Sequence, residues 1–116
     1  QGAEHPLTGR ILSRLGELYL AEKQYSQADD VCRQAVKVLE NSLGADNDCT
    51  AMAFNNLARL YIHQGKYTEA QELCQKALDV LENTLGPNHP NVIKVLETIA
   101  QLNNRTEKTI KVAKLD

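Results

Sequence analysis

The sequence is poor in the residues that loop-rich and aromatic-rich folds need. Its 116 residues include six glycines and three prolines, too few for a loop-rich all-β domain or a flexible linker. Tryptophan is absent and aromatic residues make up 4%, so the core must be built from aliphatic side chains and alanine. No apolar run approaches the roughly 20 residues of a membrane-spanning helix, and no signal-peptide pattern is present. We expect a soluble, mostly helical module with no membrane partner.

Neither sign of charge is in large excess. Thirteen Lys and Arg residues stand against fifteen Asp and Glu, which gives a net charge of −2. The isoelectric point of about 5.9 predicts that nucleic acid is not the partner.

Cysteines are few and odd in number. Cys32, Cys49 and Cys74 cannot all pair within one chain, and none belongs to a C-x-x-C motif. The three histidines lie far apart in the sequence, so we predict no metal site and no cofactor. Free thiols favour a reducing compartment, and the expected location is the cytoplasm.

The dominant feature of the chain is an internal repeat of 42 residues. Gly2, Gly44 and Gly86 recur at that interval. The same shift pairs two tyrosines of each unit, and it pairs Cys32 with Cys74. We therefore divide the single domain, 1–116, into units 2–43 and 44–85 and a partial or capping unit 86–116. Because the chain starts in an inter-repeat loop and ends within a helix pair, we expect a fragment of a longer array.

Each unit is expected to contain two helices. Phe54, Leu57, Ala58 and Tyr61 have the i, i+3, i+4, i+7 spacing of an amphipathic helix. Gly65 is expected to end that helix, and Thr68 to cap the next one. The expected breaks lie near residues 23–26, 44–48, 65–67, 86–90 and 103–106, which leaves five or six antiparallel helices and no strand.

The spacing of small and large residues resembles a known family. Leu57-Ala58-x-x-Tyr61, Gly65-Lys66-Tyr67 and Ala70-x-x-x-Cys74-x-x-Ala77 resemble the tetratricopeptide repeat. Segments 85–92, 55–58 and 64–67 are similar to the 42-residue variant found in kinesin light chain and nephrocystin-like proteins. This resemblance implies an all-α solenoid, a right-handed superhelix of antiparallel helix pairs. The third unit departs from the pattern, because Asn103 and Thr109 replace its tyrosines, and unit two has Asn47-Asp48 where the others have His-Pro.

The resemblance also implies a peptide-binding concave wall formed by the first helix of each unit. Carried onto this chain, the candidate peptide-binding residues are Arg10, Arg14, Met52, Asn55, Asn56, Arg59, His63, Lys94 and Gln101. The same wall includes Ser13, Glu17, Glu97, Thr98 and Arg105. Five basic and two acidic side chains give the wall a charge of +3, and the rest of the chain carries −5. A wall of this charge favours an acidic ligand.

The asparagines of the wall are expected to hold the backbone of an extended peptide, because an amide both donates and accepts hydrogen bonds. A full carboxylate clamp is not expected, since Ser13, Glu17 and Thr98 replace residues that it needs. The buried stripe of the second helices includes Cys32 and Cys74, and the four tyrosines are read as packing residues.

The sequence therefore predicts a non-catalytic protein-interaction module with an adaptor or scaffold role. Motifs for phosphate binding, nucleophilic catalysis and metalloprotease chemistry are absent, so no enzyme activity is expected. Two alternatives stay open. One is structural self-assembly, with a monomer or weak association through the repeat ends, and the other is an RNA-binding helical repeat.

Overall fold

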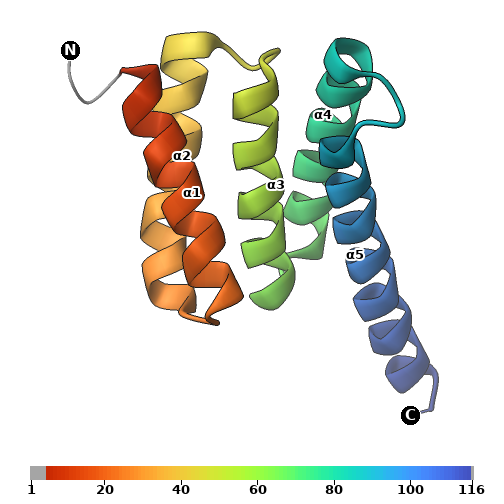
Figure 1. Ribbon diagram of the computed structural model, residues 1–116. Helices are drawn as coiled ribbons and strands as arrows, with labels where there is room; N and C mark the ends of the chain where they lie inside the picture. The colour runs from red at the N-terminus through yellow and green to blue at the C-terminus, as the bar shows by residue number, and fades with distance from the viewer. Residues whose placement is uncertain (1–4, 116) are drawn as a thin grey trace.

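Five α-helices form the chain (Figure 1). The computed structural model describes the backbone of residues 5–115 and the side chains of residues 5–108. The helices are α1 (Pro6–Ala21), α2 (Tyr25–Leu43), α3 (Asp48–His63), α4 (Tyr67–Leu85) and α5 (Pro90–Leu115). The described residues contain no strand. The expectation of an all-α helical solenoid is confirmed.

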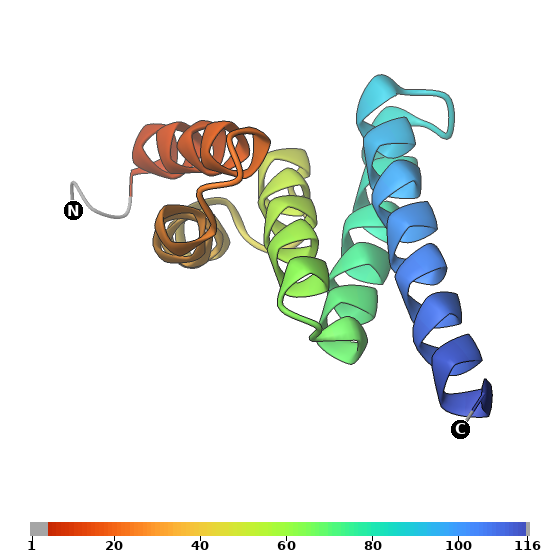
Figure 2. The ribbon, with the colours of Figure 1, turned by 90° about the horizontal axis from the view of Figure 1, so that it is seen from below.

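The helices stack in order, and contacts join near neighbours. α1 packs on α2 and α3 on α4, while α2–α3 and α4–α5 contacts join consecutive units. The first helices α1, α3 and α5 also lie side by side in that order, and the backbones of α1 and α5 do not approach each other closely within the described part of the chain. Figure 2 shows the row of helices from below, with the ends of the row turned relative to each other.

The turns between helices repeat a small set of backbone conformations. Gly44 and Gly86 follow α2 and α4 with φ of 86° and 87°, a region that side chains rarely tolerate. Gly65 ends the turn after α3 with φ of 78°, and Lys23 occupies the equivalent position after α1 with φ of 60°. The expected role of Gly65 is confirmed, while unit one achieves the same turn with a strained lysine.

A side chain caps the start of each first helix at the same repeat position. His5 Nδ1 accepts a hydrogen bond from the backbone N–H of Leu7 at 3.1 Å. His89 Nδ1 accepts from Asn91 N–H at 3.0 Å. Asn47 Oδ1 accepts from Cys49 N–H at 2.8 Å, so asparagine and histidine serve the same purpose here.

The N-cap predicted at Thr68 is wrong. Helix α4 begins at Tyr67 after Lys66, and no side chain caps it. The equivalent helix α2 begins at Tyr25 and is likewise uncapped by a side chain. These two helices start directly after a tight turn. In α4 the carboxylate of Glu69 lies in the first turn, where it interacts favourably with the positive end of the helix dipole.

The helix break predicted near 103–106 is also wrong, because α5 continues to Leu115. The position equivalent to Gly65 and Lys23 is Glu107, a good helix former in the middle of a helix. No glycine or proline lies within 103–115. Asn103 is exposed and helical, and the side chain of Thr109 lies outside the described residues.

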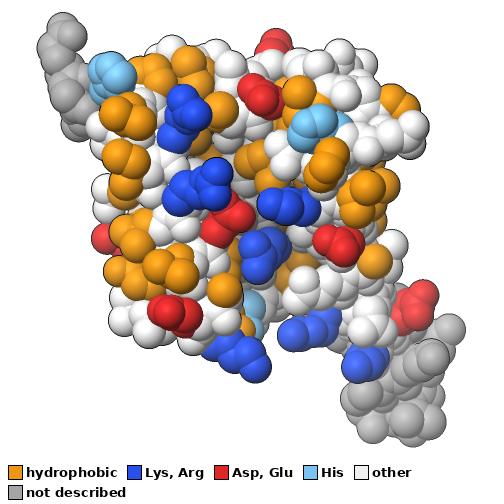
Figure 3. Space-filling view, in the orientation of Figure 1, with side chains coloured by type: hydrophobic (Ala, Val, Ile, Leu, Met, Phe, Trp, Pro, Cys, Tyr) orange, Lys and Arg blue, Asp and Glu red, His pale blue; other side chains and the backbone are white. Residues whose placement is uncertain are grey.

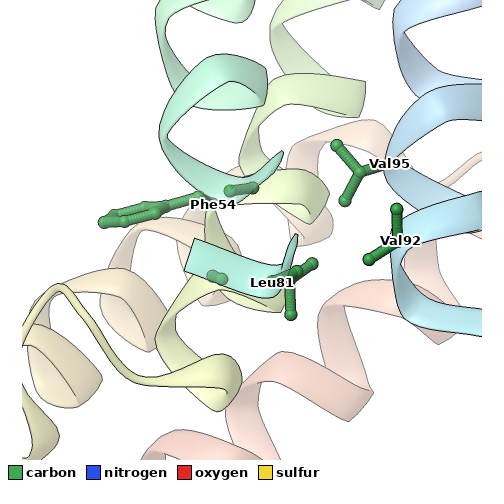
Figure 4. Close-up of a cluster of buried hydrophobic side chains, with 6 residues drawn as sticks. Phe54, Leu81, Val92 and Val95 are labelled. Atoms are coloured by element: carbon green, nitrogen blue, oxygen red, sulfur yellow. The ribbon is translucent and has the colours of Figure 1, made fainter. Parts of the chain in front are cut away.

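The core is a series of clusters of small and aliphatic side chains between successive helices. One cluster joins α3, α4 and α5 (Figure 4) and contains Ala51, Phe54, Ala77, Leu81, Val92 and Val95. Cys32 and Cys74 are buried within the others, as expected. Gly16 lets α1 approach α2 closely, because a Cβ atom there would lie 2.7 Å from Cys32 Sγ.

The two outer helices carry apolar stripes that are exposed. Leu7, Ile11 and Leu18 of α1 are each more than half exposed, and Ile93 and Leu96 of α5 are about half exposed. The repeat equivalents of Ile11 and Leu18 in α3 are Ala53 and Leu60, which are 1% and 0% exposed. Figure 3 shows hydrophobic side chains along both edges of the face that α1, α3 and α5 form. Ala53 and Leu60 pack against unit one. The α3 equivalents of Ile93 and Leu96 are Ala51 and Phe54, which are buried in one cluster with Ala77 and Leu81 of α4.

Candidate functional site: the groove of α1, α3 and α5

Three adjoining hollows run along the face formed by α1, α3 and α5, and together we call them the groove. The upper hollow, of about 210 Å³, lies near the start of α3. The middle hollow, of about 320 Å³, shares Glu17, Met52 and Lys94 with it. The lower hollow, of about 130 Å³, shares Arg59 and Gln101 with the middle one. The groove is therefore continuous across both unit boundaries.

All of the wall positions expected from the repeat line this groove. Arg10, Ser13, Arg14, Glu17, Met52 and Lys94 line the upper hollow. The middle hollow is lined by Glu17, Met52, Asn55, Asn56, Arg59, Lys94, Glu97, Thr98 and Gln101. Arg59, His63, Gln101 and Arg105 line the lower hollow. The structure thus brings every candidate residue to one surface, because the residues occupy one stripe of three neighbouring helices.

Positive side chains gather over the centre of this face (Figure 3). Arg10, Arg14 and Lys94 are exposed and have no ion-pair partner among the described residues. Sequence reasoning missed one carboxylate, because Asp48 at the start of α3 also lines the upper hollow. The excess of positive charge is therefore two rather than three. Asp48 could have been anticipated from its place in the first turn, next to the upper end of the wall.

The two asparagines lie at the floor of the groove and are buried, at 3% exposure for Asn55 and 2% for Asn56. Asn56 Nδ2 donates to both the backbone oxygen and Oγ of Ser13, each at 3.2 Å. This amide therefore links α3 to α1, a role that the expected peptide clamp did not include. The side-chain oxygens of Asn55 and Asn56 have no hydrogen-bond partner within the described part of the chain, which is unusual for buried polar atoms.

The lower hollow is lined by residues of all three units, and a ring stack in it crosses the boundary between units one and two. The rings of Tyr25, from α2, and His63, from α3, stack with centroids 3.5 Å apart and 12° between their planes. Tyr25 was expected to be a packing residue alone, but it also lines this hollow. The stack fixes the imidazole of His63 at the end of the groove.

The buried thiols are not suited to chemistry. Burial raises the pKa of Cys32 and that of Cys74 to about 11 each, so both are protonated at neutral pH. Cys49 is partly exposed beside the upper hollow. A thiol at a helix start needs a partner base to become a strong nucleophile, and neither a hydrogen bond nor an ion pair links the Cys49 side chain to such a base among the described residues.

The side chains of residues 5–108 form no recognisable metal centre. No group of three or more histidine, cysteine, aspartate or glutamate side chains in that part of the chain could hold a metal ion. No helix within the described residues is long and apolar enough to cross a membrane.

Comparison with known proteins agrees with the repeat geometry. The family model of the tetratricopeptide repeat matches residues 7–68 and, in a second placement, residues 49–112. No curated protein matches the chain. The two placements together span almost the whole described structure, the first over α1, α2 and α3 and the second over α3, α4 and α5. By sequence and by fold, the chain belongs to the tetratricopeptide repeat family.

Proposed function

We propose that this protein binds an extended, acidic segment of a partner protein in its groove and has no chemistry of its own. Tetratricopeptide repeats generally mediate protein–protein interactions. The observation that carries the finer proposal is the continuous groove across α1, α3 and α5. Arg10, Arg14 and Lys94 lie along it, are exposed, and have no ion-pair partner among the described residues. The role is that of an adaptor or scaffold.

Exposed side chains at the sides of the groove and amide side chains at its floor have different roles in the proposed recognition. Arg14 and Lys94 stand on opposite sides of the groove and can meet carboxylates of the ligand. At the floor, the side-chain oxygens of Asn55 and Asn56 lack donors among the described residues but are buried, so they can accept backbone N–H groups of a peptide only after these side chains turn toward the groove. The Asn56 amide nitrogen is already used by Ser13, so it is not offered to the ligand.

The test uses amidated peptide libraries rich in Asp and Glu, compared with libraries rich in Lys and Arg, in anisotropy titrations. We expect micromolar affinity for the acidic library, weakening as salt is raised. Arg14→Gln and Lys94→Gln should each weaken binding by up to about fivefold, the effect of one exposed charge pair. Lys37→Gln changes an exposed lysine of α2 outside the groove and should bind like the native chain.

Equal binding by all four proteins would show that the groove is not the site. Asn56→Ala is a poor probe of binding, because it also removes a buried contact between α1 and α3. Exposed groove residues therefore give the cleaner experiment.

A second candidate function is self-assembly through the ends of the stack. The exposed stripes of α1 and α5 favour it, since their equivalents in α3 are buried. Sedimentation at increasing concentration tests it. A monomer at all concentrations, with the acidic library bound, would favour the first function alone.

The proposal also covers the type of repeat and the location of the protein in the cell. The 42-residue spacing and its Asn-Asn-Leu-Ala and Gln-Gly-Lys-Tyr segments support a relation to the repeats of kinesin light chain and nephrocystin-like proteins. The three free cysteines support a cytoplasmic location. Fractionation of cells that express the tagged protein tests the location.

A further inference from the structure

We propose that the lower hollow is a subsite for a phosphorylated serine or threonine of the bound segment. The inference rests on the proposed peptide binding and assigns to one end of the groove a ligand of defined chemistry. The hollow is lined by Leu20, Tyr25, Arg59, His63, Gln101 and Arg105.

The first argument is the distribution of charge along the groove. The upper hollow has three cationic side chains and two carboxylates, and the middle hollow has two of each. The lower hollow has two guanidinium groups and an imidazole, and no carboxylate of the described residues lines it. A group with a double negative charge is therefore favoured at the lower end of the groove above the rest of it.

The second argument is the arrangement of donors. Arg59 and His63 stand one turn apart on α3, and Gln101 and Arg105 stand one turn apart on α5. The two pairs face one hollow from neighbouring helices, which contact each other. Guanidinium and amide groups donate hydrogen bonds in planes that suit phosphate oxygens.

The third argument is preorganisation. The His63 ring is held by its stack on Tyr25, and the Arg59 side chain is partly buried with no ion-pair partner among the described residues. A ligand therefore meets an imidazole that is already oriented and a guanidinium that no described carboxylate neutralises. Less ordering is then required when the anion binds.

Size and charge together select the ligand class. At about 130 Å³, the hollow is smaller than the roughly 300–1,000 Å³ of small-molecule sites, so it suits a side-chain end group. A phosphorylated serine carries about −1.5 to −2 charges at pH 7, whereas a glutamate carries one. Phosphate thus matches the cluster better than a carboxylate does.

The experiment compares four peptide libraries of one composition with the intact chain. Three are amidated and carry phosphoserine, glutamate or serine at a fixed central position, and the fourth has central serine and a free C-terminal carboxylate. We expect the phosphoserine library to bind about tenfold more tightly than the glutamate library, the effect of one additional charge-assisted hydrogen bond. Arg59→Gln and Arg105→Gln should reduce that preference to within about twofold.

Arg10→Gln is the matched control, because it removes a guanidinium from the upper hollow only. It should weaken binding of the phosphoserine and glutamate libraries alike and leave the preference intact. Circular dichroism and thermal midpoints establish that each variant folds, and Arg59→Lys retains a charge at the site if Arg59→Gln does not fold. Partial retention of the preference in Arg59→Lys would support the subsite.

The failures of the two proposals are distinguishable. Equal binding of the phosphoserine and glutamate libraries would overturn the phosphate subsite while the groove proposal stands. A preference that survives both Arg59→Gln and Arg105→Gln would place phosphate elsewhere and overturn the assignment. Tight binding of the free-carboxylate library in place of the phosphoserine library would assign the hollow to a chain terminus. No binding of any library would overturn the groove proposal and the subsite with it.

Discussion

Lys23 and Gly65 occupy the same position of their units, and both have a left-handed backbone, with φ of 60° and 78°. That conformation costs a residue with a Cβ atom roughly 1–2 kcal/mol. Glycine avoids this cost but loses about 0.5–1 kcal/mol more through entropy on folding. The balance favours glycine at both sites.

We therefore predict that Lys23→Gly raises the free energy of unfolding by about 0.5–1 kcal/mol, and that Gly65→Lys lowers it by a similar amount. Urea unfolding of the two variants measures both effects. A loss of stability in Lys23→Gly would contradict the left-handed turn after α1.

Cys32 and Cys74 give the protein a pH dependence in the alkaline range. Burial raises the pKa of each thiol from 9.0 to about 11. Between these values the folded chain keeps protons that the unfolded chain has lost, so stability falls as pH rises. The contribution is fully present below pH 9 and is lost as the pH rises through about 11, on the order of 3 kcal/mol for each thiol.

The measurement is the free energy of unfolding from pH 8 to 11 for the native chain and for Cys32→Ala with Cys74→Ala. Lysines and tyrosines titrate in the same range in both proteins, so the difference between the curves isolates the thiols. Parallel curves would show that the thiols are not desolvated.

At the level of the helix, the capping position is shared by His5, Asn47 and His89. We predict that His89→Ala lowers the free energy of unfolding by about 1 kcal/mol, the usual loss of an N-cap. His89→Asn should retain most of it, because unit two uses asparagine there. Thermal denaturation compares the three proteins. Equal loss in both variants would contradict the interchange of asparagine and histidine, and no loss in His89→Ala would mean that the hydrogen bond from Asn91 N–H does not stabilise the fold.

Of the five helix breaks predicted from the sequence, four are present in the structure, since glycine, proline and the spacing of apolar residues are local signals. The prediction failed at 103–106. The repeat register suggested a break there, but Glu107, which stands at the position of Gly65, favours a continuous helix. Local helix propensity outweighed the register there. The side-chain caps of α1 and α5 were missed, because histidine is not among the usual capping residues.

The sequence predicted which residues line the groove, but not which of them are buried or which contact one another across units. The register placed all the wall positions on one face. The burial of Asn56 depends on how closely α3 approaches Ser13 of α1, and the stack of Tyr25 on His63 crosses two units. Both depend on the angle between units, which no spacing along one helix reveals.

On the scale of the whole molecule, equivalent residues differ in importance according to the place of their unit. Leu18 is 53% exposed on the outer face of α1, while Leu60 in α3 is fully buried. We predict that Leu60→Ala lowers the free energy of unfolding by about 2–5 kcal/mol. Leu18→Ala should change it by no more than about 0.5 kcal/mol.

Chemical denaturation of both variants at low protein concentration tests this, so that self-association does not contribute. A large effect of Leu18→Ala under those conditions would show that its face is covered in the monomer.

The separation of the two outer helices has a mechanical consequence. Since the backbones of α1 and α5 do not approach each other within the described part of the chain, no direct packing of one helix backbone on the other holds the two ends of the stack together there. A force applied between the termini is carried by one helix interface after another. The chain should then lengthen in small steps at low force and regain its length when the force is released. A protein of this construction can act as an elastic element between whatever holds its two ends.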